Sequence, residues 1–274
     1  MHKPVKLFIV EGAVKENQYV KDMTQRFFQG RYESKIINLS AEQNIYMLYK
    51  SLARDGFDTD IVEVLKETVD EARSVLTGIN RQEIDEVFLF FDFDCHQDNT
   101  NPSDPRAGDI ISAMLEFFNN ETEYGKLYIS YPMVEALRDY RERECESLTG
   151  CWIPVEDVGN YKQLAGSNNP HNSHKMNIEE WREVINAFYF RLKCLMEAGE
   201  LEYSSYKDDI TPKTIYEAEH RALVDYKHVF VLSAFPEFLL DYFKKDFWHA
   251  NVKRRKNNYR DCQRRTSLIC KSVL

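Results

Sequence analysis

Short strand-like stretches rich in apolar residues are the feature that most constrains how this 274-residue chain can fold. A continuous apolar run of about four to eight residues is typical of a strand that is buried on both faces of a sheet. Such stretches lie in the first half of the sequence, as VKLFIV at 5–10, KIINLS at 35–40, EVFLFFDFD at 86–94 and KLYISYP at 126–132. We predict a strand at each of them.

Segments with helical character alternate with these strands. They lie at 15–28, 42–54, 59–76 and 107–118, and the first has apolar residues three and four positions apart, as on one face of a helix. Strands that alternate with helices favour a mostly parallel sheet that is covered by helices on both faces. The sequence therefore predicts an α/β fold for this half of the chain.

The character of the sequence changes after residue 140. The stretch at 155–175 is polar and rich in turn formers, so we expect a loop or lid there rather than core. Helical patterns follow at 178–197, 212–226 and 232–247. We therefore expect an α/β domain at 1–150, and at 151–274 a polar loop, a helical appendage and a basic tail.

The composition of the chain indicates the cellular compartment of the protein. No apolar run approaches the roughly 20 residues that cross a bilayer, and the start MHKPVKLFIVEG lacks a signal-peptide cleavage pattern. Six cysteines are scattered without a C-x-x-C pair, which indicates reduced thiols. These features predict a cytoplasmic protein that has no membrane partner.

The charge of the chain is unevenly placed. A formal net charge of −9 argues against general electrostatic adhesion to nucleic acid. Near the C-terminus, however, the segment NVKRRKNNYRDCQRR at 251–265 is strongly basic. This segment leaves two interpretations open, a local basic patch that contacts a partner or a solvated helix or tail.

Carboxylates follow three of the predicted strands. Glu11 ends the first strand and Glu16 lies in the next turn, Asp92 and Asp94 end the strand at 86–94, and Glu135 follows the strand at 126–132. In an open parallel sheet, functional groups collect beyond the carboxyl ends of the strands. Each acid alone is compatible with ordinary helix-dipole or turn chemistry. Together they would repel one another unless a cation compensated them, which predicts a divalent metal site.

The expected chemistry of such a site is phosphoryl chemistry. Hard cations such as Mg²⁺ and Mn²⁺ take oxygen ligands, and two of them about 4 Å apart can activate a water and stabilise the leaving oxygen of a phosphodiester. Gly12 would allow the backbone to approach a phosphate closely. The chain has no G-x-x-x-x-G-K-[ST] loop, so we do not expect a P-loop nucleotide hydrolase.

These residues resemble the TOPRIM fold of topoisomerases, bacterial primases and OLD-type nucleases, which carries E-G after its first strand and D-x-D after a later one. The chain is most similar to the RloB and OLD-like group of bacterial defence proteins. Its first motif, E-G-x-x-x-E-x-x-Y, is present as Glu11, Gly12, Glu16 and Tyr19, and its third motif resembles Ser130, Pro132 and Glu135. The resemblance covers about residues 5 to 140.

The resemblance implies a TOPRIM-like, Rossmann-like domain that acts as a Mg²⁺- or Mn²⁺-dependent endonuclease with two metal ions. Glu11 would be a metal ligand or general base, and Asp92 and Asp94 would hold the metals. Glu16 and Glu135 would complete the second metal site. OLD-like nucleases also use a late lysine to stabilise charge on the phosphate, and Lys162 is our candidate for it, followed by Lys175.

The resemblance also implies partners. The chain lacks the ATPase domain of OLD proteins, and in related defence systems such as the PARIS pair a separate ATPase of the ABC type holds a TOPRIM effector that resembles a transfer-RNA ribonuclease. We therefore expect the toxic effector of an anti-phage system, which cuts RNA such as tRNA, or DNA, alone, as a homo-oligomer or with an ATPase partner. The alternatives are an inactive TOPRIM-like module that docks to such a partner and a primase-like nucleotidyl transferase.

A zinc site at Cys95 and His96 is not predicted, because no C-x-x-C or H-x-x-x-H partner lies nearby.

Overall fold

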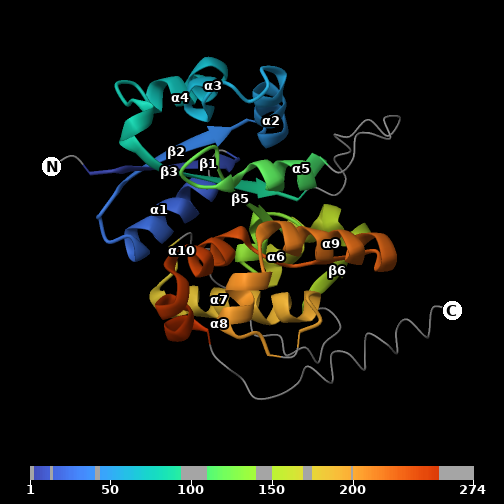
Figure 1. Ribbon diagram of the computed structural model, residues 1–274. Helices are drawn as coiled ribbons and strands as arrows, with labels where there is room; N and C mark the ends of the chain where they lie inside the picture. Colours follow the sequence, from blue (N-terminus) through green and yellow to red (C-terminus); the bar gives the residue numbers. More distant parts are fainter. Residues whose placement is uncertain are drawn as a thin grey trace. The chain divides into compact units, whose positions relative to one another are not determined.

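The computed structural model of the protein describes residues 3–12, 15–40, 44–93, 110–139, 150–168, 175–198 and 200–252 (Figure 1). The chain forms two compact units. Unit 1 comprises Met1–Asp92, His96–Tyr128 and Ser173–Met176, and unit 2 comprises Phe93–Cys95, Ile129–Asn172 and Asn177–Leu274. The expected domain boundary at residue 150 stays a prediction.

A five-stranded sheet with the strand order β2-β1-β3-β5-β4 organises the first half of the chain. Its strands are β1 (Val5–Glu11), β2 (Glu33–Leu39), β3 (Ile84–Asp92), β4 (Asn119–Asn120) and β5 (Gly125–Ser130). β1 pairs parallel with both β2 and β3, and β4 pairs antiparallel with β5. The predicted α/β class with a mostly parallel sheet is therefore confirmed, and the short β4 is an addition that the sequence did not reveal.

β1 is buried on both faces, as its continuous apolar run predicted. Val5 and the four residues from Leu7 to Val10 are fully buried, and the Phe8 ring packs against the rings of Phe28 and Phe88. Lys6 is fully buried as well. Its ammonium group forms an ion pair with Glu86, the residue that lies opposite it on β3, and this pairing compensates the buried charge.

The position of β5 beside β3 depends on Gly125. A β-carbon at Gly125, which has φ +108°, would lie 2.5 Å from Leu89 Cδ1 and 3.0 Å from Val87 Cγ1, so only glycine fits. Farther along the two strands, the Phe93 N–H donates a hydrogen bond to Ser130 O at 2.9 Å. β5 therefore runs in the same direction as β3.

Five of the described helices flank the sheet of unit 1. They are α1 (Lys15–Phe27), α2 (Ile45–Arg54), α3 (Ile61–Thr68), α4 (Asp70–Val75) and α5 (Ile110–Phe117). Figure 1 shows α2, α3 and α4 together on one side of the sheet and α1 on the other. The side chains of Asn44 and Asp60 accept hydrogen bonds from the first turns of α2 and α3, which fixes where these helices begin.

The single helix predicted at 59–76 is wrong in one respect, because it is broken at Val69. Val69 has extended backbone angles, φ −121° and ψ 112°, and separates α3 from α4. The Arg73 side chain reaches back to the Lys66 and Glu67 carbonyl oxygens at 3.2 and 3.3 Å. This contact satisfies carbonyl groups that the break would otherwise leave without partners.

Unit 2 is mostly helical. Its elements are η3 (Val134–Leu137), β6 (Trp152–Pro154), η4 (Val155–Asn160), α6 (Tyr161–Asn168), α7 (Ile178–Leu195), α8 (Tyr203–Asp209), α9 (Pro212–Tyr226), β7 (His228–Phe230) and α10 (Ala234–Asn251). β6 and β7 form a two-stranded antiparallel sheet. The predicted helices at 178–197, 212–226 and 232–247 correspond to α7, α9 and α10.

The polar stretch at 155–175 is not a loop throughout, which corrects the prediction made for it. Residues 155–168 form η4 and α6, and Val158, Tyr161 and Ala165 are buried. These three residues are spaced three and four apart, so they occupy one helix face that packs inward. The expectation of a loop was wrong for these residues because a short apolar stripe within the polar stretch is enough to form a helix that packs inward. Among the described residues, no helix is both long and apolar enough to span a membrane.

α10 changes direction at Lys244. This residue has φ 60° and ψ −147°, a conformation that side-chain-bearing residues rarely adopt, and it divides α10 into two helical parts. Trp248 in the second part is 2% exposed and packs against the Tyr206 ring at a centroid distance of 4.6 Å. The Asn186 side chain in α7 donates a hydrogen bond to Asn251 O at 2.9 Å, so side-chain contacts hold this second part.

Glu219 is a fully buried carboxyl group on α9. Burial raises its pKa well above the ordinary value, and a hydrogen bond of 3.1 Å from the Phe230 N–H acts in the opposite direction. The sequence contained a signal for it, since Glu219 lies four residues after Ile215 and three before Ala222, both buried. We infer that Glu219 remains protonated in the folded chain at pH values where it ionises in the unfolded chain.

We predict that Glu219→Gln removes a pH dependence of stability. The folded chain holds this proton more tightly than the unfolded chain, so the unfolding free energy of the parent should fall by about 1.4 kcal/mol per pH unit as the pH rises from the ordinary pKa of about 4.3 towards the raised pKa of the folded chain. The amide of the variant carries no titrating proton, so the variant should lack this contribution. Urea titrations of both proteins at several pH values measure it. Glu217→Gln, an exposed change on the same helix, should keep the parent's slope.

Candidate functional site

Two of the predicted site residues meet at the ends of neighbouring parallel strands in unit 1. Glu11 is the last residue of β1 and Asp92 is the last residue of β3. Both side chains are half-buried, and the Asp92 N–H lies 3.5 Å from Glu11 Oε2. The parallel pairing of β1 and β3 therefore brings these two acids to one edge of the sheet, as the sequence predicted.

Gly12 and Glu16 extend this edge. The Gly12 N–H donates to Leu39 O at 3.4 Å, and Gly12 has φ +110°. A β-carbon at Gly12 would lie 2.7 Å from both carboxylate oxygens of Glu16. The Glu16 carboxylate thus folds back from α1 over the backbone of Gly12, directly after Glu11. The absence of a side chain at Gly12 is what makes room for it.

The remaining acid of the D-x-D pair, Asp94, lies outside the described residues, as do Cys95 and His96. Within the described ranges, no group of three or more His, Cys, Asp or Glu side chains is arranged to hold a metal ion. Of the residues predicted to bind metal, the structure describes Glu11, Glu16 and Asp92 in unit 1.

Glu135 belongs to unit 2, where it lies on the short helix η3 and is 4% exposed. The Arg138 N–H donates to Glu135 O at 2.9 Å, and the Asp139 N–H donates to Ala136 O at 3.3 Å. These bonds close the single turn that carries Glu135. A carboxyl group this deeply buried requires polar surroundings.

A buried polar network that the sequence did not predict lies at the end of η3. The Tyr161 hydroxyl donates to Asp139 Oδ2 at 3.2 Å, and Arg191 Nη2 lies 3.7 Å from Asp139 Oδ1. Burial, and then the charge of Asp139, raises the pKa of Tyr161 well above its ordinary value, and Glu135 adds a smaller effect in the same direction. Tyr161 therefore remains a neutral hydrogen-bond donor beside η3.

Arg191 connects this network to two further segments. Its Nε donates to Gly150 O at 3.0 Å, and its Nη1 donates to Val231 O at 3.2 Å. The sequence contained a signal for it, because Arg191 continues the apolar stripe of α7 seven residues after Val184 and four residues before Leu195. An arginine at such a position requires buried acceptors.

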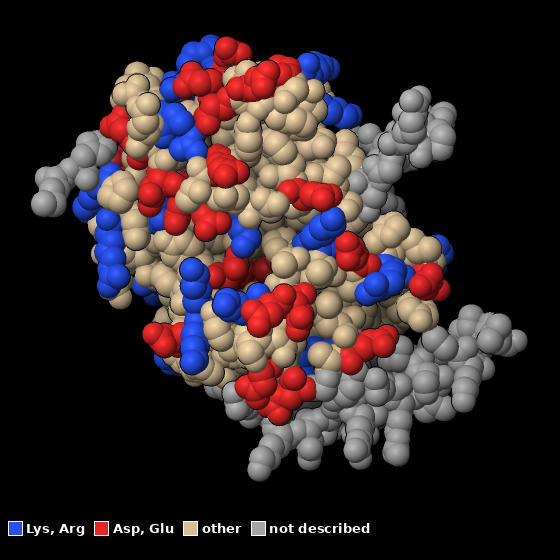
Figure 2. All heavy atoms as spheres, in the orientation of Figure 1, with Lys and Arg blue, Asp and Glu red and all other residues tan. Residues whose placement is uncertain are grey.

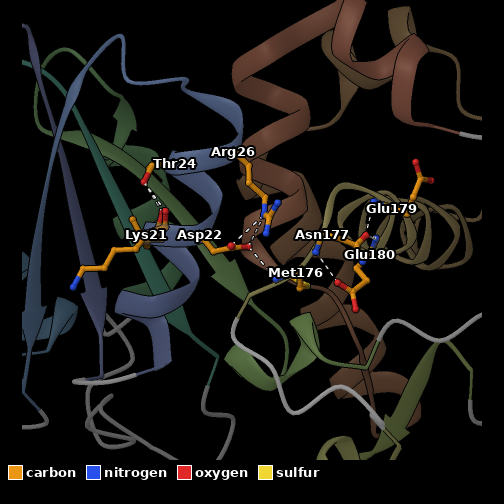
Figure 3. Close-up of polar contacts among 9 residues, drawn as sticks. Lys21, Asp22, Thr24, Arg26, Met176, Asn177, Glu179 and Glu180 are labelled. Atoms are coloured by element: carbon orange, nitrogen blue, oxygen red, sulfur yellow. Dashed lines mark hydrogen bonds and ion pairs between the residues drawn. The ribbon is translucent and has the colours of Figure 1, made fainter.

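The two candidate lysines belong to different units. Lys162 is exposed on α6 in unit 2, whereas Lys175 is exposed and belongs to unit 1. Lys175 is anchored near α1, because the N–H of the next residue, Met176, donates to the buried Asp22 carboxylate at 3.1 Å (Figure 3). The same carboxylate accepts from Arg26 Nε. Lys175 therefore shares a unit with Glu11, Glu16 and Asp92, and Lys162 does not.

Charges of both signs are interspersed over the described residues on the face shown in Figure 2. The basic segment at 253–265, for which a local patch or a solvated tail was expected, lies outside the described residues.

We predict that Gly12→Ala destabilises unit 1. The new methyl group would face the Glu16 carboxylate at a backbone angle that disfavours a β-carbon, so the unfolding free energy should fall by about 1–3 kcal/mol. Chemical denaturation measures the change. Gly159→Ala is the matched control, since its β-carbon meets nothing within 4 Å, and it should leave the stability unchanged or slightly raised. Equal effects of the two substitutions would contradict the assigned role of Gly12.

Comparison of this chain with models of protein families, with curated proteins and with solved structures gave no match.

Proposed function

We propose that this chain is a TOPRIM-type, divalent-metal-dependent endonuclease that cleaves phosphodiester bonds. The observation that carries the proposal is the meeting of Glu11 and Asp92 at the ends of two neighbouring parallel strands, 3.5 Å apart from carboxylate oxygen to backbone nitrogen. The carboxyl edge of a parallel sheet is where α/β enzymes place their reacting groups. Glu11 of the E-G motif and Asp92, the first acid of the D-x-D motif, lie at this edge.

The chemistry of the donor set fits a hard cation. Glu11, Glu16 and Asp92 offer only carboxylate oxygens, which Mg²⁺ and Mn²⁺ prefer, and Asp94 and Glu135 are the further ligands that the resemblance implies. A divalent ion held there would lower the pKa of a bound water and neutralise charge on a phosphodiester. The fold-back of the Glu16 carboxylate over Gly12 supports this assignment, because it brings a second carboxylate against the residue that directly follows Glu11.

The chain's own residues would hold the substrate and the ligands in place. Gly12 presents backbone without a side chain, which suits the close approach of a phosphate. In unit 2, the contacts of Asp139 with Tyr161 and Arg191 restrain η3 and so fix the backbone that carries Glu135. Lys162 and Lys175 are both candidates for the lysine that stabilises charge on the phosphate. Lys175 belongs to the same unit as Glu11 and Asp92, which favours it.

The substrate class that we propose is nucleic acid, either RNA such as tRNA or DNA. The biological role that follows from the resemblance is that of a toxic effector in anti-phage defence, released or held by an ABC-type ATPase partner. A basic segment at 253–265 in a chain of net charge −9 supports a localised contact with a polyanion.

We predict that Glu11→Gln combined with Asp92→Asn abolishes metal-dependent cleavage. The purified full chain would be incubated with tRNA, single-stranded DNA and duplex DNA in Mg²⁺, in Mn²⁺ and in chelator. Both substitutions keep the side-chain size but remove the charge that holds a cation, so the cleavage rate should fall at least about 100-fold. Asp70→Asn is the matched control, because Asp70 is exposed on α4 and pairs only with Arg73 among the described residues. It should keep the parent's rate.

The alternative function is a TOPRIM-like module that binds an ATPase partner and does not cleave. Calorimetric titration with Mn²⁺ separates the two functions, because the nuclease should bind the ion in the parent and lose affinity in the Glu11→Gln/Asp92→Asn variant. Binding of no ion by the parent would favour the module. Full metal-dependent cleavage by the variant would overturn the site.

A further inference from the structure

Two thiols of unit 2 lie in contact although they are distant in sequence. Cys151 directly precedes β6, and Cys194 lies in the last turn of α7. Their Sγ atoms are 3.4 Å apart across a separation of 43 residues, and both cysteines are reduced. A disulfide bond is about 2.05 Å long, so the two sulfur atoms need to approach by only about a further 1.4 Å to bond.

The surrounding fold holds these thiols at contact. Cys151 O accepts a hydrogen bond of 2.8 Å from the Val231 N–H, and Gly150 O accepts one of 3.0 Å from Arg191 Nε. Arg191 lies less than one helical turn before Cys194 on α7. The hydrogen bonds that position the two backbones therefore also keep the sulfur atoms together, without a covalent bond between them.

The two thiols differ in access. Cys151 is 8% exposed, whereas Cys194 is half-buried and so is the more accessible residue of the two. A reagent in solution would therefore meet Cys194 first, and Cys151 is placed to react with Cys194. A more accessible attacking thiol beside a second thiol within contact distance suits two-step thiol–disulfide exchange.

We propose that Cys151 and Cys194 form a reversible disulfide when the protein meets a small-molecule disulfide such as oxidised glutathione. The Cys194 thiolate attacks one sulfur of the reagent, forms a mixed disulfide and releases one thiolate. The Cys151 thiolate then attacks Cys194 Sγ and releases the second. Two protein thiols are oxidised, one reagent disulfide is reduced to two thiols, and the two protons pass to those products.

The new bond would fasten the start of β6 to the end of α7. It would join covalently the same two segments that Arg191 joins by its hydrogen bond to Gly150. A crosslink across 43 residues restricts the unfolded chain more than the folded one, so it should stabilise unit 2. The proposal does not depend on the nuclease assignment, because its readouts are covalent mass and unfolding temperature.

The first test identifies the bond. The full chain would be treated with oxidised glutathione, blocked with an alkylating reagent and digested with trypsin and a glutamate-specific protease, which separates Cys145 from Cys151 by cutting after Glu146. Mass spectrometry of the unreduced digest should show the Cys151 and Cys194 peptides linked, with the loss of two hydrogens. Reduction should release both.

The second test uses variants. Oxidation should raise the unfolding temperature of the parent by about 5 °C or more. Cys194→Ser should show no such rise, and Cys151→Ser should accumulate the mixed disulfide at Cys194. Cys262→Ser, a change outside both elements, is the matched control and should behave as the parent.

Two results would overturn the proposal. One is a parent that carries a stable mixed disulfide at Cys194 without the linked peptide, which would mean that Cys151 cannot resolve it. The other is the recovery of both cysteines as unmodified thiols after oxidation, while accessible thiols of the same protein have reacted. If Cys151→Ser fails to fold, the linked peptide in the parent and the response of Cys194→Ser still decide the question.

Discussion

The burial of β1 on both faces is the constraint on which the rest of unit 1 depends. Because β1 pairs parallel with β2 and β3, all three strands end at one edge of the sheet, and Glu11 and Asp92 come to lie at that edge. The same burial requires Lys6 to be neutralised, and Glu86 on β3 does so. The apolar run therefore fixes both the centre of the sheet and the location of its acidic edge.

The parts of the fold that could be predicted are those whose sequence pattern lies within a single segment of the chain. The apolar run of β1 and the helical spacing of α7 are each contained in one segment, and the structure has them nearly where the pattern placed them. The break at Val69 and the helix at 161–168 were not predicted. The break is stabilised by Arg73, which bonds to carbonyl groups six and seven residues away, and the helix carries only a short apolar stripe in a polar composition.

The residues of the candidate site also fall into those that could be predicted and those that could not. Glu11 and Asp92 could be predicted because each follows directly from its own strand. The network of Asp139, Tyr161 and Arg191 could not, since it joins three segments whose proximity arises only from tertiary packing. Its one sequence signal was an arginine on an apolar helix face. A charged residue that interrupts an otherwise apolar stripe is thus a useful indicator of a buried network even when its partners cannot be named.

The change of direction at Lys244 has a mechanical consequence. Beyond it, the second part of α10 is held by Trp248, which packs against Tyr206, and by Asn251, whose carbonyl accepts from Asn186. Force applied to the chain after Val252 would not pass along one continuous ladder of helical hydrogen bonds. It would first load these lateral contacts, so the end of α10 should detach under tension before the longer part of the helix unwinds.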